Sequence, residues 1–339
     1  MRVLFIGGTG LISSACSEAS LAEGHELWLL NRGRSVYAPA EGARVLHANA
    51  RDEEALAKAV GEHEWDSVVE WIAYTPADVV RDLRVFEGRT RQYIFISSAS
   101  VYQKPPSHWL ITESTPLRNP FWKYSQDKIS CEHLLAGQSR VPWTVVRPSH
   151  TYGPSQVPIG VGSWEKPYTV IDRMRRGAPV IVPGDGTSLW TVTHNSDFAR
   201  GFVGLLGREE ALGEAFHITS DEALSWGQIY RAVAGAAGAE ANLLAVPTDA
   251  IAAADPASLG GLWGDKSHSA VFDNAKIRSL VPGFRATVPL ADGIRATIAW
   301  FDADPARRAI DEAANALWDR LAAVYQGALR DAGALAAQG

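Results

Sequence analysis

The side chains best suited to chemistry are Tyr124 and Lys128, four residues apart in Tyr124-Ser-Gln-Asp-Lys128. On a helix this spacing puts both side chains on one face. An ammonium group beside a phenol favours the phenolate and lowers the pKa of the tyrosine, which then exchanges protons near neutral pH. The pair alone is a weak indication, because both residue types are common on helix surfaces.

Two further motifs precede this pair in the chain. The serines Ser97-Ser98 end an apolar run, and the glycine-rich turn Gly7-Gly-Thr-Gly10 follows the first apolar run. Gly7 permits a tight turn, and Gly10 lets the backbone approach a pyrophosphate at the N-terminus of the following helix. Together with Tyr124 and Lys128, in this chain order, the motifs predict a nicotinamide-dependent enzyme.

The first half of the chain alternates strand-like and helix-like segments. We expect strands at residues 2–6, 26–30, 44–48, 66–72, 93–97 and 143–147, and helices at 11–23 and 53–60. Such alternation is typical of an α/β fold in which helices cover both faces of a parallel sheet. The predicted fold class is therefore a Rossmann doubly wound parallel sheet with a smaller mixed C-terminal substrate lobe, whose ligands bind at the carboxyl ends of the strands.

The composition changes after Pro148, where glycine and proline become frequent. We expect an NAD(P)-binding domain over residues 1–150, with returning segments at approximately 190–220, and a substrate-binding lobe over most of 151–304. The alanine-rich stretch 232–254 is expected to be helical, and 305–331 has the amphipathic pattern of one closing helix. That helix is compatible with a core role or with a homodimer interface.

The bulk properties exclude several classes of protein. With 46% hydrophobic and 21% charged residues, the chain is typical of a globular protein. Its net charge of −6 argues against nucleic acid as a main partner, because phosphate binding needs a basic face. It contains neither a membrane-spanning apolar stretch nor room for a signal peptide before the first strand, which predicts a cytoplasmic location. The two cysteines, Cys16 and Cys131, form no disulfide framework or metal motif, and we expect both to be buried.

The end of the second strand bears on which nicotinamide is used. A carboxylate at this place binds the adenosine ribose hydroxyls of NAD, whereas arginine accommodates the 2′-phosphate of NADP. The chain has Asn31-Arg32-Gly33-Arg34 there, without a carboxylate. NADP(H) is therefore favoured, and NAD(H) stays open, because both arginines could instead face solvent or stack on adenine.

With these motifs, the chain resembles the extended short-chain dehydrogenase/reductase family of NAD-dependent epimerases and dehydratases. Within the family it is most similar to the atypical branch that includes the chloroplast stem-loop-binding proteins. The resemblance covers about residues 1–300. Besides the motifs above, it rests on Asp66-Ser-Val-Val, Ile72-Ala-Tyr-Thr-Pro76, Ser97-Ser-Ala-Ser-Val-Tyr102, Arg147-Pro148, Tyr152-Gly-Pro154, Gly184-Asp-Gly186 and Phe272-Asp-Asn-Ala-Lys276.

The resemblance implies a role for each matching residue. Ser98 would hydrogen-bond the reacting oxygen, Tyr124 would move the proton, and Lys128 would bind the nicotinamide ribose and lower the pKa of Tyr124. Cofactor contacts besides Tyr124 and Lys128 are expected from Gly7, Thr9, Gly10, Leu11, Ile12, Asn31, Arg32, Arg34, Ser35, Asn49, Ala50, Ile72, Ala73, Tyr74, Ser97, Pro148 and His150. Substrate contacts are expected from Ser98, Ser100, Tyr102, Tyr152 and Trp190. No metal is expected.

One departure from the family pattern concerns the substrate. Many relatives that act on nucleotide sugars carry an arginine for the substrate diphosphate where this chain has Trp190. An indole cannot neutralise a diphosphate but can stack on a ring, which favours a substrate without a nucleoside diphosphate. Alternatively, Trp190 belongs to the core of the lobe and Arg173 or Arg175 takes over the task.

The leading hypothesis is an enzyme acting on a hydroxyl or carbonyl carbon of a polar, sugar-like small molecule. Epimerisation or dehydration would need a further acid or base, for which Glu70, Glu113 and His150 are candidates. The alternative is a non-catalytic NAD(P)-binding regulatory or RNA-binding protein on the same fold. Intact Ser98, Tyr124 and Lys128 disfavour the loss of catalysis, and the acidic balance disfavours RNA.

Overall fold

The computed structural model describes residues 1–35 and 37–336, which fall into two compact units. The first unit comprises Met1–Tyr152, Thr191–Asp221 and Val271–Val288. The second unit comprises Gly153–Trp190, Glu222–Ala270 and the chain from Pro289 on. Val271–Val288 thus belongs to the first unit rather than to the predicted substrate lobe, because Val271 and Phe272 pair with Leu110 and Ile111.

A seven-stranded parallel sheet forms the centre of the first unit. Its strands are β1 (Arg2–Ile6), β2 (Glu26–Asn31), β3 (Arg44–His47), β4 (Ser67–Glu70), β5 (Tyr93–Ile96), β7 (Trp143–Pro148) and β11 (Glu214–Ile218). Their order is β11-β7-β5-β4-β1-β2-β3. The chain therefore reverses its direction of winding between β1 and β4, where ligands bind in such sheets. The predicted Rossmann architecture is confirmed.

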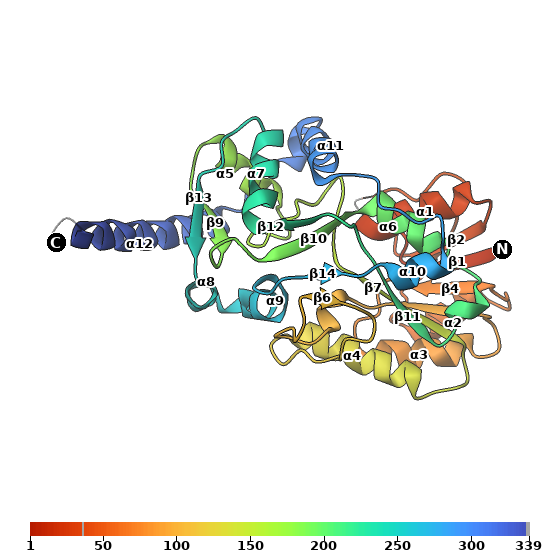
Figure 1. Ribbon diagram of the computed structural model, residues 1–339. Coiled ribbons are helices and arrows are strands. Elements are labelled where there is room, and N and C mark those ends of the chain that lie inside the picture. Colours follow the sequence, from red (N-terminus) through yellow and green to blue (C-terminus); the bar gives the residue numbers. More distant parts are fainter. Residues whose placement is uncertain (36, 337–339) are drawn as a thin grey trace. The chain divides into compact units, whose positions relative to one another are not determined.

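Helices cover both faces of this sheet, and alternate residues of β1 face opposite sides. Val3 and Phe5 pack with α1 (Leu11–Ala22) and α6 (Asn195–Val203). Leu4 and Ile6 pack on the other face, which is covered by α2 (Glu53–Val60), α3 (Pro76–Phe86) and α4 (Lys123–Ala136). Figure 1 shows the two groups of helices on opposite sides of the strands. Cys16 and Cys131 are buried on opposite faces, as expected.

Shorter elements complete the first unit. They are η1 (Ala99–Val101), β6 (Leu110–Ile111), β8 (His150–Tyr152), η2 (Glu209–Ala211), β14 (Val271–Phe272) and α10 (Ala275–Leu280). The strand β10 (Leu189–His194) runs from the second unit into the first, where it pairs in parallel with β8.

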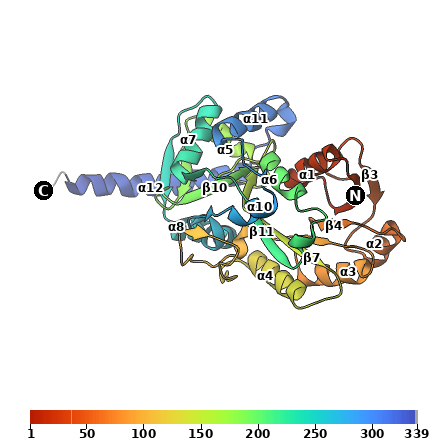
Figure 2. The same ribbon diagram turned by 45° about the vertical axis from the view of Figure 1, so that its right-hand side comes forward.

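The second unit consists mainly of helices around a two-stranded parallel sheet. It contains α5 (Tyr168–Arg175), β9 (Val180–Pro183), β12 (Ala223–Ser225), α7 (Trp226–Ala236), β13 (Leu243–Val246), α8 (Thr248–Ala254), η3 (Pro256–Ser258), α9 (Leu259–Gly261), η4 (Leu262–Lys266), α11 (Leu290–Asp302), η5 (Pro305–Arg307) and α12 (Glu312–Ala336). Figures 1 and 2 both show α7 lying beside α5 and α11. Ile181, Leu244, Trp318 and Leu321 contribute to its core.

Two predictions about the second unit were wrong. Within 232–254, the strand β13 interrupts the predicted helix, because Leu244 and Val246 are buried and β13 pairs with β9. The closing helix begins at Glu312 instead of residue 305. The Asp311 carboxylate accepts the Ala314 N–H and so supplies the helix start.

Across residues 1–35 and 37–336, no helix is both long enough and apolar enough to cross a membrane.

Candidate active site

The turn after β1 is shaped to bring the backbone close to a ligand. Gly7 and Gly8 have φ angles of +109° and +87°, which disfavour other residues. A Cβ at Gly8 would come within 2.6 Å of the Leu29 side chain. Gly10 then caps the N-terminus of α1, whose first N–H groups lack partners within the helix. The predicted phosphate-binding residues therefore form a cradle that fits a pyrophosphate.

This turn lies directly beside the segment that follows β4. A Cβ at Gly7 would meet Trp71 at 3.1 Å and Ile72 at 3.3 Å. Ile72 and Tyr74 are 38% and 43% exposed, whereas Ala73 is fully buried. The structure thus brings two groups of predicted cofactor residues together where the order of the strands reverses.

The Glu70 side chain holds the backbone of this segment in place. Its carboxyl group is fully buried and accepts the Ile72 N–H at 2.6 Å. Burial, assisted by the charge of Asp82, raises the pKa of Glu70 well above its usual value. The buried group therefore holds the backbone of this segment in place. This placement disfavours Glu70 as the additional acid or base.

Lys128 is held by the segment that follows β4 and by the last residue of β5. Its Nζ donates to Ala73 O at 2.7 Å and to Ile96 O at 2.8 Å, and the residue is 2% exposed. Burial lowers the pKa of Lys128 to about 8, although nearby acidic groups such as Glu70 oppose this shift. The ammonium form is therefore favoured at neutral pH, but less strongly than in water.

Tyr124 lies in the first turn of α4, half-buried beside this lysine. The Lys128 Nζ is 5.8 Å from the centre of the Tyr124 ring. The rings of Trp122 and Tyr74 lie 4.8 Å and 6.2 Å from the Tyr124 ring. The predicted helix therefore does bring the phenol and the ammonium group close to each other.

The two serines after β5 differ in their surroundings. Ser98 is partly exposed, and its Oγ accepts the Ser100 N–H at 3.2 Å. Ser97 is 4% exposed and its hydroxyl donates to Glu132. Ser98 thus keeps access to a ligand, whereas the Ser97 hydroxyl is bound inside the fold.

The predicted adenosine side follows β2 and β3. Asn31 Oδ1 accepts the Gly33 N–H at 2.8 Å and so shapes the turn, while Arg32 and Arg34 are exposed. The Ser35 hydroxyl donates to the Thr9 carbonyl, which joins this turn to the glycine-rich one. Farther along, Asn49 is exposed and Ala50 is buried. Leu11 and Ile12, in the first turn of α1, are half-buried.

Most of the predicted substrate residues are buried. Ser100 and Tyr102 are 3% and 0% exposed, and the Tyr102 hydroxyl pairs with His217 Nδ1 at 2.9 Å. Tyr152 packs against His194, and Trp190 stacks on Trp226 within the second unit. Pro148 and His150, predicted to contact the cofactor, are also buried. Among the five predicted substrate residues, Ser98 alone keeps partial exposure in this arrangement.

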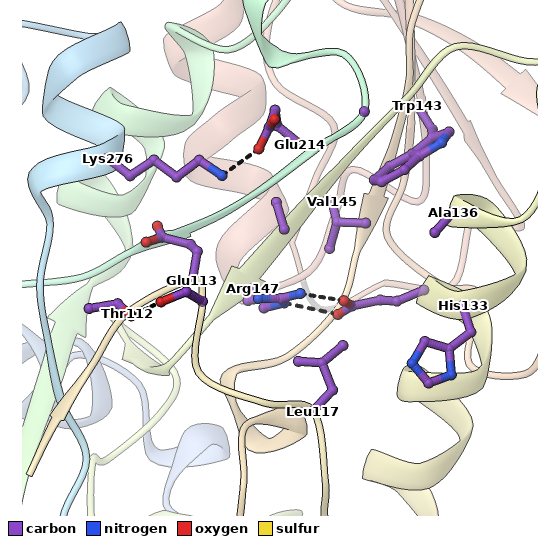
Figure 3. Close-up of a pocket in the computed structure, with 14 residues that line it drawn as sticks. Thr112, Glu113, Leu117, His133, Ala136, Trp143, Val145, Arg147, Glu214 and Lys276 are labelled. Atoms are coloured by element: carbon purple, nitrogen blue, oxygen red, sulfur yellow. Dashed lines mark hydrogen bonds and ion pairs between the residues drawn. The ribbon is translucent and has the colours of Figure 1, made fainter. Parts of the chain in front are cut away.

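A pocket of about 540 Å³ lies elsewhere in the first unit (Figure 3). It is lined by Thr112, Glu113, Ser114, Leu117, Glu132, His133, Ala136, Trp143, Val145, Arg147, Gly213, Glu214, Ala215 and Lys276. Ser98, Tyr124 and Lys128 are absent from its lining. Glu113, a predicted acid/base candidate, therefore lies in a different pocket, where its carboxylate accepts the His217 N–H at 3.2 Å.

A buried ion pair in this pocket was not recognised from the sequence. Arg147 donates from Nε and Nη2 to both oxygens of Glu132, at 3.1 Å and 2.6 Å (Figure 3). Burial opposes the charge, but the hydrogen bonds to Glu132 more than offset it and raise the pKa of Arg147. The partners are 15 residues apart, on α4 and β7, so no local spacing indicates this pair.

Within the described ranges, no group of histidine, cysteine or acidic residues could hold a metal ion.

Comparisons with known proteins show the family of the chain. A model of the NAD dependent epimerase/dehydratase family matches residues 3–219, more than half of the chain. The chain therefore belongs to the NAD dependent epimerase/dehydratase family. The predicted resemblance to extended short-chain dehydrogenases/reductases is confirmed.

Two relatives illustrate the range of the family. The chloroplast stem-loop binding protein of 41 kDa b from Arabidopsis thaliana is 28% identical over 70% of this chain, and the match spans 63% of that protein's own length. The 2′-dehydrokanamycin reductase of Streptomyces kanamyceticus is 25% identical over 74% of this chain and 70% of its own.

The same fold occurs in solved structures. The UDP-glucose 4-epimerase of Bifidobacterium longum in complex with NAD⁺ and UDP superposes with a TM-score of 0.72 at 19% identity, covering 90% of this chain and 99% of that one. The fold, the glycine-rich turn and the family together place the chain among the extended short-chain dehydrogenases/reductases.

Proposed function

We propose that this protein transfers hydride to or from a hydroxyl or carbonyl carbon of a polar, sugar-like small molecule, with Tyr124 as the acid or base. The observation that carries the proposal is the arrangement on α4. The Lys128 ammonium, fixed by Ala73 O and Ile96 O, lies 5.8 Å from the Tyr124 ring. A positive charge beside the phenol group would favour the phenolate and so ease proton exchange.

Each part of the site has a role in this reaction. The Gly7–Gly10 turn and the N-terminus of α1 would hold the pyrophosphate of the dinucleotide. When bound, the nicotinamide supplies the hydride exchange. In the direction of reduction, Tyr124 gives its proton to the carbonyl oxygen while the carbonyl carbon receives the hydride. Ser98 donates a hydrogen bond to the same oxygen, and Lys128 binds the ribose.

Simple oxidation or reduction is favoured over reactions that abstract a proton from carbon. Dehydration, and epimerisation at a carbon next to a carbonyl, need an additional acid or base at the substrate. Of the three candidates, Glu70 is buried under the backbone and His150 is 8% exposed. Glu113 faces a different pocket. None of the three therefore presents a carboxyl or imidazole group beside Ser98 in this arrangement.

The substrate proposed here lacks a nucleoside diphosphate. Trp190, at the place of the family's arginine, is 1% exposed and lies beneath Lys266. The two arginines considered as replacements are occupied within the second unit. Arg173 is 1% exposed and binds Pro179 O and Asp319, and Arg175 forms two hydrogen bonds with Asp302. The relative named 2′-dehydrokanamycin reductase supports the same class of substrate.

A turnover screen tests the proposal. Keto sugars and keto-aminocyclitols without a nucleotide should consume NADPH or NADH, monitored by nicotinamide absorbance, and UDP-glucose and dTDP-glucose should not be converted. Conversion of the nucleotide sugars alone would overturn the substrate class. Absence of any turnover, combined with tight binding of stem-loop RNA, would favour the non-catalytic alternative that the plant relative suggests.

The proposal also concerns which nicotinamide nucleotide the site accepts, NAD(H) or NADP(H). The family description and the epimerase complex point to NAD. The exposed Arg32 and Arg34 after β2, where a carboxylate is absent, support acceptance of a 2′-phosphate. We propose that Arg32 lets the site accept NADPH as well as NADH.

Arg32→Ala should raise the Kd for NADPH roughly 10-fold and leave the Kd for NADH unchanged, because one charge-assisted hydrogen bond to phosphate is lost. Fluorescence titration of both reduced nucleotides measures this. Arg91→Ala is a matched control, since Arg91 is exposed and precedes β5 at the opposite end of the sheet. Equal weakening of both nucleotides by Arg32→Ala would show that Arg32 does not distinguish the 2′-phosphate.

A further inference from the structure

We infer that Ser100 and Ser125 are positioning residues that fix the direction of the Ser98 hydroxyl, so that its hydrogen points outward to the reacting oxygen. The inference rests on the proposed function, because it assigns how Ser98 meets the substrate. It also gives Ser100 a role other than the substrate contact predicted from the sequence.

The three hydroxyl groups form a continuous chain. Ser125 Oγ donates to Ser100 Oγ at 2.7 Å, and Ser100 Oγ lies 2.9 Å from Ser98 Oγ. Ser125 and Ser100 are 0% and 3% exposed, whereas Ser98 is partly exposed. The chain therefore runs from the buried side of α4 to the accessible serine after β5.

Burial decides the direction of the hydrogen bond between Ser98 and Ser100. If Ser98 donated to Ser100, the Ser100 hydroxyl would accept two hydrogen bonds, and its own hydrogen would need another acceptor. Within the described part of the chain, Ser125 and Ser98 are the partners that the Ser100 hydroxyl has. A buried O–H without an acceptor is unfavourable. Ser100 must therefore donate to Ser98.

If Ser100 donates to Ser98, the Ser98 hydroxyl can still donate its own hydrogen. A serine hydroxyl has two acceptor lone pairs and one donor hydrogen. Ser98 Oγ accepts from the Ser100 hydroxyl and from the Ser100 N–H at 3.2 Å, so both lone pairs are engaged. Its hydrogen is then the group that it can offer to a ligand. Ser98 thus acts as a donor and suits a carbonyl oxygen, which can only accept.

The backbone that carries the chain is itself fixed. Asn119, 3% exposed, donates from Nδ2 to Ser100 O at 2.8 Å. Ser125 directly follows Tyr124 on α4. Successive hydroxyl donors also polarise one another and strengthen the last hydrogen bond in the chain. The helix that carries the proton donor thereby also orients the serine that binds the same oxygen.

A double-mutant cycle on Ser98 and Ser100 tests the inference. With a ketone reduced by the wild type, Ser100→Ala should lower kcat roughly 10-fold with KM almost unchanged, the effect of about one hydrogen bond. In the Ser98→Ala background the same change should have no further effect, because Ser100 acts through Ser98. Ser130→Ala is the matched control, because Ser130 is an exposed serine on α4, the helix that carries Ser125.

The outcomes separate this inference from the proposed function. A wild type that converts no ketone or alcohol overturns the proposed function and the inference with it. An active wild type in which Ser100→Ala is harmless, or lowers kcat equally with and without Ser98, overturns the inference alone. If Ser100→Ala does not fold, Ser125→Ala serves instead. It frees the Ser100 hydroxyl to turn and should lower kcat about 2-fold with Ser98 present and not in its absence.

Discussion

Tyr124→Phe should lower kcat about 1,000-fold while the Kd for the reduced nucleotide and the melting temperature stay unchanged. The substitution removes the oxygen that exchanges the proton, a loss that typically costs 10²- to 10⁴-fold. It keeps the aromatic ring beside Trp122 and Tyr74, so the packing in the first turn of α4 is retained. Steady-state kinetics with the best ketone of the screen measures the effect.

Tyr325→Phe is a matched control, because Tyr325 is a half-buried tyrosine on α12 in the core of the second unit. It should leave kcat unchanged. A Tyr124→Phe variant that retains wild-type turnover would show that Tyr124 is not the acid or base, and the enzymatic proposal would then fail in its central residue.

Arg147→Met should destabilise the protein by about 3–5 kcal/mol, because it leaves the buried Glu132 carboxylate without its counter-charge. Both side chains of the pair are 5% exposed. For a unit of this size, such a loss lowers the melting temperature by roughly 10 °C. Calorimetry measures the effect.

An ion pair at the surface with the same two-hydrogen-bond geometry serves as the control. Arg84 binds both oxygens of Glu53 at 3.0 Å and 2.6 Å, but the two side chains are 54% and 43% exposed. Arg84→Met should hardly change the melting temperature.

The double variant Arg147→Met/Glu132→Gln should recover much of the stability that Arg147→Met loses, since the side-chain amide oxygen introduced by Glu132→Gln would still accept the hydrogen bond from Ser97. If it is as unstable as Arg147→Met, lost packing and not the unpaired charge is responsible.

The sequence predicted the elements that have a strong local signal. The strand Arg2–Ile6 and the helix Glu53–Val60 have the predicted bounds, because apolar runs, caps and turn glycines coincide there. Leu243–Val246 was missed, since alanines on either side favour a helix and only pairing with β9 makes it a strand. Local propensity is a weak guide where tertiary pairing decides.

In the candidate site, too, the local features were predicted from the sequence and the tertiary ones were not. Glycines with positive φ and the four-residue spacing of Tyr124 and Lys128 are local properties, and both were read from the sequence. Whether an aromatic residue after a strand faces a ligand or the core is a tertiary property. Tyr102 and Trp190 were predicted to meet the substrate and are buried. Composition and spacing cannot distinguish these two surroundings.

The hydrogen bonds of Lys128 have a consequence for the energetics of cofactor binding. An ammonium group carries three hydrogens, and Ala73 O and Ile96 O take two of them. One hydrogen is left for the proposed contact with the nicotinamide ribose, and the four-carbon side chain is already confined to a single direction. The entropy of ordering a lysine side chain is thus lost when the chain folds and not when the nucleotide arrives. Folding has prepared the site, so binding energy remains available for the chemical step.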